Sequence, residues 1–264
     1  MCIVGQSSRM RIIKHRGPFR AVEIFLEDVS ISEIRNLQKQ FQRISILVHR
    51  PLELSPVFRL RHKKTPNIHL EEGIEKVFFA FQRTVRNEIH KTERMENLEI
   101  RLPDHERESA FRAYQDFEFA QHRAPIQRSE FDQFILAGAY LDGRFISGIT
   151  FFQTGSSIRV RSIFSLRLGL KELEDKELYR TIGNASKRLV YEICRYGISN
   201  GATIVDLASI NLTDPAKKSI ADFKGSFGAA IEDEYQYAWS SPIFRLMERC
   251  AAVAARVRAR LRVR

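Results

Sequence analysis

A lysine beside a glycine-rich turn is the residue of this sequence best suited to chemistry. The run DFKGSFG, residues 222–228, closes a helix predicted to begin at Pro215, so Lys224 lies where that helix ends. Gly225 and Gly228 permit a positive φ angle and close approach of another backbone. The turn therefore predicts a site in which a substrate lies against the backbone, beside an ammonium group and aromatic rings.

The same run also has a purely structural interpretation. In that interpretation Gly225 ends the helix, Lys224 complements the helix dipole, and Phe223 and Phe227 anchor the core. Spacing alone leaves both interpretations open. The short apolar strand predicted before the helix ends in Asp206. The strand that ends at Asp206 and the helix that ends at Lys224 must therefore position any site at this turn.

The order of elements from residue 104 onward indicates the fold class. Three strands joined at two hairpin signals follow two helices, and a helix, a strand, a helix and a strand come next. The predicted elements are helices at 104–119 and 129–134, strands at 135–141, 145–153 and 157–165, a helix at 175–199, a strand at 203–207, a helix at 215–223 and a strand at 229–237. This order predicts an α/β (α+β layered) fold with a mixed, largely antiparallel central sheet flanked by helices.

The first hundred residues give a weaker pattern. A helix capped by Ser30 or Ser32 runs to Phe41, and the run RISILVHR that follows reads as a strand. One long helix is expected over 73–96, with apolar residues along one face. The opposite face is basic, and it is either an ordinary solvated face or a cationic wall for a phosphate or carboxylate. That face carries Arg83, Arg86, Asn87, His90, Lys91 and Arg94.

Composition limits the classes of protein. The chain has 264 residues and a net charge of +11, and residues 245–264 contain seven arginines against one acid. A basic tail of this kind favours a phosphate-bearing surface or lipid over sequence reading of DNA, with nucleic acid left as an alternative. The three cysteines, Cys2, Cys194 and Cys250, indicate neither a disulfide framework nor a zinc site. No signal peptide and no membrane span is predicted, so we expect a cytoplasmic protein.

Two runs carry a resemblance to a known family. The run GISNGATIVDLASINLTDPAKKSIADFKGSFGAAIEDEYQY resembles the end of the FemAB-like, or peptidoglycan-bridge, branch of the Gcn5-related N-acyltransferases (GNAT), which has a G-x-x-x-x-D strand, a loop, a helix and F-K-x-x-F-G. The run RTVRNEIHKTER is similar to the basic helix R-x-x-I-x-K/R-A-x-R of that branch. The resemblance covers residues 65–237. It implies a GNAT-like domain at 71–240, with a partial N-terminal subdomain at 1–70 and a basic tail at 241–264.

The resemblance implies roles at the turn. Lys224 would stabilise a developing oxyanion or bind a donor phosphate, which are tasks for a fixed positive charge in a partly dry site. Phe223 and Phe227 would border the substrate pocket. Asp206 would orient an attacking amine or accept its proton, or else cap the loop that follows it. No metal site and no nucleophilic Ser or Cys triad is expected.

The resemblance also implies roles for residues outside the turn, but one motif of the family is absent from this sequence. Arg86 and Lys91 would match basic positions that contact a phosphorylated acceptor. The usual Q/R-x-x-G-x-G/A loop, whose amides hold the coenzyme A pyrophosphate, is missing. Arg167, Gly169 and Lys171 are the expected substitute anion site. The donor is therefore acyl-coenzyme A or aminoacyl-tRNA, and no tightly bound cofactor is expected.

The leading function is N-acyl transfer to the amine of an amino sugar, in bacterial surface-polysaccharide or cell-wall precursor synthesis. The first alternative is aminoacyl-tRNA-dependent transfer to a peptidoglycan precursor. The second is a non-catalytic adaptor or nucleic-acid-binding module with the same fold. The basic tail is either a solvated appendage or an attachment to an anionic membrane, where a lipid-linked glycan acceptor would be found. Removing 245–264 would release the protein from anionic vesicles in the second case.

Overall fold

The chain separates into two compact units in the structure, which is a computed structural model. It describes residues 10–16, 18–26, 29–169, 175–211, 215–248 and 250. The large unit comprises the described residues of Lys64–Glu232, and the small unit those of Arg9–Lys63 and Asp233–Arg264. The chain passes from the small unit to the large unit within strand β4 (Arg59–His69) and returns to the small unit within strand β10 (Ala230–Ser240). The expected boundaries after residues 70 and 240 stay a prediction.

The small unit is built from both ends of the described chain. β1 (Met10–Arg16) and β2 (Phe19–Phe25) form a hairpin that the sequence analysis did not predict. Helix α1 (Ile31–Gln40) crosses from β2 to the parallel strand β3 (Arg43–Val48), and β10 pairs antiparallel to β3. The predicted cap is confirmed, because the Glu33 amide donates to Ser30 Oγ at 3.2 Å.

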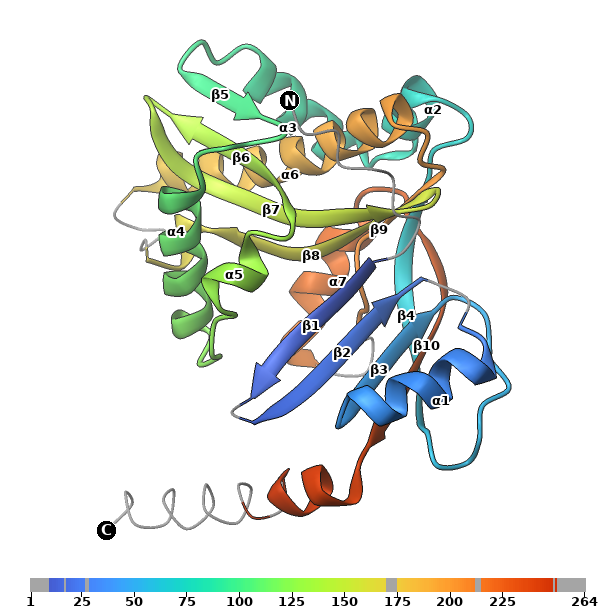
Figure 1. The fold of residues 1–264 in the computed structure, drawn as a ribbon. Helices are drawn as coiled ribbons and strands as arrows, with labels where there is room; N and C mark the ends of the chain where they lie inside the picture. Colours follow the sequence, from blue (N-terminus) through green and yellow to red (C-terminus); the bar gives the residue numbers. More distant parts are fainter. Residues whose placement is uncertain are drawn as a thin grey trace. The chain divides into compact units, whose positions relative to one another are not determined.

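The large unit contains the predicted meander and the strands that follow it (Figure 1). Its strand order is β4-β9-β8-β7-β6-β5, with every pair antiparallel except β8 and β9. The bounds are β5 (Leu98–Arg101), β6 (Ile135–Leu141), β7 (Arg144–Thr154), β8 (Ser157–Ser165) and β9 (Ile204–Asp206). The predicted mixed, largely antiparallel sheet is therefore confirmed.

Helices cover both faces of this sheet. Helix α6 (Lys176–Ser199) packs on one face through Ile182, Leu189 and Ile193, as its amphipathic pattern predicted. Helix α4 (Arg107–Ala120) and the short α5 (Arg128–Phe131) pack on the other. Alternate residues of β6 confirm the division, because Ala137 and Ala139 belong to the first core and Leu136 and Tyr140 to the second.

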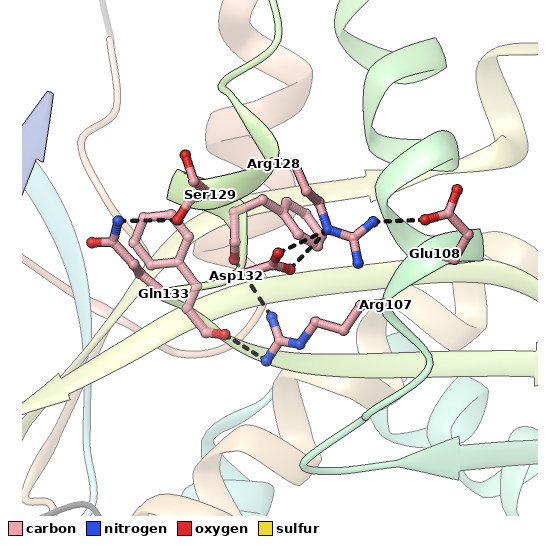
Figure 2. A network of polar contacts seen from close by, with 8 residues as sticks. Arg107, Glu108, Arg128, Ser129, Asp132 and Gln133 are labelled. Atoms are coloured by element: carbon pink, nitrogen blue, oxygen red, sulfur yellow. Dashed lines mark hydrogen bonds and ion pairs between the residues drawn. The ribbon is translucent and has the colours of Figure 1, made fainter. Parts of the chain in front are cut away.

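Two arginines fix α5 against α4 (Figure 2). Arg107 on α4 donates to the Phe134 carbonyl at 2.8 Å, just beyond the end of α5. Arg128 at the start of α5 bonds Asp132 and Glu108, each at 2.9 Å. Guanidinium groups satisfy carbonyls that the short helix leaves without an intrahelical partner. The contacts explain how so short a helix keeps its place over the sheet.

Helix α4 begins three residues later than predicted. Asp104, the expected first residue, is buried and its carboxylate accepts from the Tyr140 hydroxyl at 2.7 Å and from the Glu106 amide at 2.9 Å. Burial, together with this hydrogen bond, raises the pKa of Tyr140, so the phenol stays protonated and donates. Asp104 therefore anchors the segment before α4 to the sheet.

The prediction of one long helix over 73–96 is wrong, because the structure has two helices there, α2 (Ile74–Ala80) and α3 (Arg83–Glu93). Phe81 between them has an extended conformation, with φ −63° and ψ 146°. The Arg86 guanidinium donates to the carbonyls of Phe79 and Phe81 and so satisfies the end of α2. The apolar face was predicted correctly, since Val77, Phe81, Val85 and Ile89 are all buried.

Within the described residues, no helix is both long enough and apolar enough to cross a membrane.

Candidate active site

Strands β8 and β9 diverge after a short parallel pairing. Ser157, Ile158 and Arg159 pair with 204–206, after which β9 ends and β8 continues to Ser165. In the part of the chain that the structure describes, no strand pairs with this edge of β8 beyond Arg159. A strand edge of this kind presents backbone N–H and C=O groups along its length, as an extended ligand requires.

A buried ion pair marks the point of divergence. Asp206, with no exposed surface, forms an ion pair with Arg159, which is 6% exposed. Asp206 Oδ1 also accepts from Thr65 Oγ1 at 2.5 Å and from the Ala208 amide at 2.7 Å. The expected loop-capping hydrogen bond is thus present, and the role of Asp206 towards an amine stays a prediction. Sequence reasoning missed Arg159, although a basic residue between Ile158 and Val160 in an apolar strand was a usable signal.

Lys224 reaches the same loop from the other side. It lies near the end of α7 (Lys218–Gly225), is 9% exposed, and donates from Nζ to the carbonyls of Ala208 at 2.8 Å and Ser209 at 3.3 Å. Ala208 has φ 65°, a strained conformation for a residue with a side chain. The two predicted catalytic residues therefore meet at Ala208, since Asp206 binds its N–H and Lys224 its C=O.

The two aromatic residues of the turn pack on each other and on the core. The rings of Phe223 and Phe227 are 5.2 Å apart in a T-shaped arrangement, and Phe227 is also 5.2 Å from Phe81. Phe227 has no exposed surface, and Phe223 is partly buried against the same core. This is the packing that the core-anchor interpretation expects. Contact with a substrate stays a prediction for both rings.

The turn after Lys224 docks on the break between α2 and α3. The Gln82 amide donates to the Ser226 carbonyl at 2.9 Å. Gly228 has φ +63°, and a Cβ built there would lie 2.4 Å from the Ala80 carbonyl oxygen. Gly225 was expected to supply a positive φ as well, but α7 runs through it and only Gly228 of the two does so. The run 197–237 therefore contacts the residues that immediately precede the run 83–94.

Replacing the two glycines of this turn should have opposite consequences. Gly228→Ala is expected to lower the free energy of unfolding by more than about 1 kcal/mol, because alanine disfavours the positive φ and its Cβ meets a backbone carbonyl. Gly225→Ala is the matched control, since nothing lies within 4 Å of its Cβ and alanine favours the helix. Urea denaturation of both variants measures the difference. Equal losses would show that the turn does not dock as described.

Arg86 and Lys91, the predicted contacts of a phosphorylated acceptor, have different surroundings. The guanidinium of Arg86 binds the carbonyls at the end of α2 and stands over the Phe79 ring, with 5.1 Å from Cζ to the ring centroid. Lys91 is exposed in the last turn of α3. The structure thus gives Arg86 a part in shaping the break on which the turn docks. Binding of an acceptor stays a prediction for both residues.

The predicted substitute anion site is only partly described. The Arg167 guanidinium stacks on the Tyr179 ring of α6, with 3.8 Å from Cζ to the centroid. Gly169 ends a short 3-10 helix, Leu166–Gly169, and Lys171 lies outside the described residues. At the start of α6 the Leu178 amide donates to the Asp175 carboxylate at 2.9 Å. A carboxylate therefore stands where helix N-termini bind phosphate.

The described residues offer neither a nucleophilic thiol nor a metal centre at this site. Cys194 is fully buried in α6, and burial raises the pKa of its thiol, so it is an unreactive core residue. No group of three or more His, Cys, Asp and Glu side chains in the described chain is placed to hold a metal ion.

Solved structures of other proteins share the fold of this chain. FemX matches with a TM-score of 0.58 at 12% identity, covering 90% of this chain and 86% of its own. The C-terminal domain of a predicted lysylphosphatidylglycerol synthetase from Agrobacterium fabrum has a TM-score of 0.53 at 13% identity, with coverage of 94% and 89%. L-PGS from Bacillus licheniformis has a TM-score of 0.53 at 10% identity, with coverage of 89% and 81%. No protein-family model and no curated protein sequence matches the chain.

Proposed function

We propose that this chain is a transferase that moves an acyl group from an activated ester or thioester to the amine of an amino sugar, in the synthesis of a bacterial surface polysaccharide or cell-wall precursor. The observation that carries the proposal is the meeting of Lys224 and Asp206 at Ala208, where β8 and β9 diverge. The fold shared with FemX and L-PGS supports the reaction class. The proposed site of action is the cytoplasm.

The proposed reaction uses the edge of β8 beyond Arg159, with which no described strand pairs, to hold the donor in an extended form. The amine nitrogen attacks the donor carbonyl carbon, negative charge develops on the carbonyl oxygen, and the bond to the leaving sulfur or oxygen then breaks. Lys224 Nζ is the positive group that stabilises the developing oxyanion, exchanging its bond to a loop carbonyl for one to the substrate. The leaving thiolate or alkoxide takes up a proton lost by the amine.

Asp206 suits a positioning role within the protein better than proton removal. Its carboxylate already accepts from Thr65, from the Ala208 amide and from Arg159. Those donors occupy most of the lone pairs that a carboxylate offers. We therefore assign Asp206 the task of holding the Ala208 loop, and through it Lys224, in the reactive geometry.

A second candidate is an aminoacyl-tRNA donor. Two observations favour it: a carboxylate occupies the N-terminus of α6, where a coenzyme A pyrophosphate would otherwise bind, and the fold matches over most of the chain with proteins named lysylphosphatidylglycerol synthetase and FemX. The acceptor would then be a cell-wall precursor or a lipid. No tightly bound cofactor is proposed for either donor.

Titration of the purified chain with acetyl-coenzyme A, a longer acyl-coenzyme A and charged tRNA tests these proposals. Saturable binding of one thioester, weakened in Lys224→Ala, is the expected result for the first function. Binding of charged tRNA alone would support the second, with a steep loss of affinity as salt rises. Binding of no donor would point to a catalytically silent adaptor and contradict both transferase proposals.

A further inference from the structure

The net charge of the sequence lies entirely in the two ranges whose described residues form the small unit. Over Arg9–Lys63 and Asp233–Arg264 the sequence has 19 lysines and arginines against 8 acids. The rest of the sequence has 24 of each, so these two ranges carry the whole +11, and their described residues, which form the small unit, have 12 lysines and arginines against 6 acids. A positive charge concentrated in this way in one part of the sequence indicates that this part meets a polyanionic partner.

The helix over 242–248 presents an apolar and basic side to solvent. Phe244 has no exposed surface and packs on the Phe19 ring at 5.5 Å, which fixes the helix to β2. Ile243 and Leu246 are three residues apart on the opposite side and are 69% and 64% exposed. Arg245 is exposed between them. Two large aliphatic side chains held in water beside a cation are unfavourable unless they are covered by a partner.

The beginning of β4 adds a second basic and apolar segment to the same unit. β4 neighbours β10 in the sheet, and the His62 ring stacks on Tyr235 at 4.9 Å. Arg59 and Arg61 are exposed, and Leu60 is 50% exposed. In the described chain none of Arg59, Arg61 and Arg245 takes part in an ion pair. Figure 1 shows the segment before β4 and the helix over 242–248 at the same end of this unit.

We propose that this end of the small unit docks on an anionic lipid surface. The docking face comprises Arg59, Arg61, Ile243, Arg245 and Leu246. Basic side chains interspersed with large aliphatic ones match a bilayer interface, where the cations meet headgroup phosphates and the aliphatic groups enter the acyl boundary. The arginines that the sequence places after this helix would add to the attraction. The proposal does not depend on the donor or acceptor of the transferase.

Nucleic acid fits this face less well. Proteins that bind single-stranded nucleic acid add exposed aromatic rings, on which bases stack, to their positive charge. The exposed large apolar side chains of the described small unit are all aliphatic. Exposed phenylalanines occur in the large unit instead, at Phe79 and Phe119. The apolar component of the docking face therefore distinguishes a lipid surface from an RNA.

Vesicle sedimentation with the full chain tests the proposal without any acyl donor. The protein should sediment with vesicles that contain phosphatidylglycerol and stay in solution with pure phosphatidylcholine. The variant Arg59→Gln/Arg61→Gln/Arg245→Gln should bind about 100-fold more weakly, because each basic residue near an anionic surface contributes about fivefold. The variant Ile243→Ser/Leu246→Ser should also bind more weakly. Ile220→Ser and Arg112→Gln, exposed positions of the large unit, are controls that should bind as the parent does.

The outcomes separate the lipid proposal from its rivals. Equal sedimentation with both vesicles, or unchanged binding by both docking-face variants, would overturn it. Loss of binding only when 249–264 are removed would assign the interaction to the tail alone and exclude the folded face. Competition by tRNA at equal concentration, with no effect of the serine variant, would identify a nucleic-acid surface. Circular dichroism of each variant shows that the fold is retained.

Discussion

Replacing Lys224 by methionine is expected to reduce the rate constant of acyl transfer by about 100- to 1000-fold, the usual loss when one oxyanion donor is removed. Methionine keeps the length and volume of the buried stem while it removes the charge. The ammonium group binds two carbonyls of the loop after β9 and is only 9% exposed, so its charge acts in a site from which water is largely excluded. Single-turnover kinetics with the donor found by titration measure this step.

Lys218→Met is the matched control for this substitution. Lys218 belongs to the same helix but is exposed, so losing its charge should leave the rate within about twofold. Lys224 also has a structural task, and leaving the carbonyl of Ala208 unsatisfied should cost about 1–3 kcal/mol of stability. Rates are therefore compared well below the unfolding temperature of each variant. An unchanged rate in folded Lys224→Met would remove Lys224 from the reaction.

The regular elements of the large unit were predictable because each carries its own pattern. The amphipathic repeat of α6 and the alternation of β6, β7 and β8 are local signals, and the structure has them within one or two residues of the predicted bounds. The break at Phe81 has no such signal. Phe81 continues the apolar face of the helix, and its extended conformation is stabilised by Arg86 and by Ser226 from the far end of the unit.

The candidate site was predictable in its residues but not in its contacts. Asp206 and Lys224 were identified from their types and places, whereas the ion pair between Asp206 and Arg159 forms only where β8 pairs with β9, across 47 positions of sequence. The small unit illustrates the same limit, because it joins the beginning of the chain to its end. Register and long-range pairing depend on the whole fold, and no single segment of sequence specifies them.

Asp206→Asn is expected to lower the free energy of unfolding by about 3–5 kcal/mol, because it leaves the charge of Arg159 buried without a counterion. Arg159→Met should lower the free energy of unfolding by a similar amount, because it leaves the charge of Asp206 buried without a counterion. The double variant Asp206→Asn/Arg159→Met should lose less than the sum of the two, since neither charge then remains unpaired. Urea denaturation of the three variants gives this coupling free energy directly.

Asp132→Asn provides the comparison with an exposed pair. Asp132 bonds Arg128 one turn away on the surface, and such pairs contribute about 0.3–0.5 kcal/mol. A loss at Asp206 no larger than the loss at Asp132 would mean that water reaches the β8–β9 divergence. The charge of Lys224 beside it would then be screened, and the oxyanion-stabilising role would fail for the same physical reason. The stability of one buried pair therefore tests the dry environment on which the proposed chemistry depends.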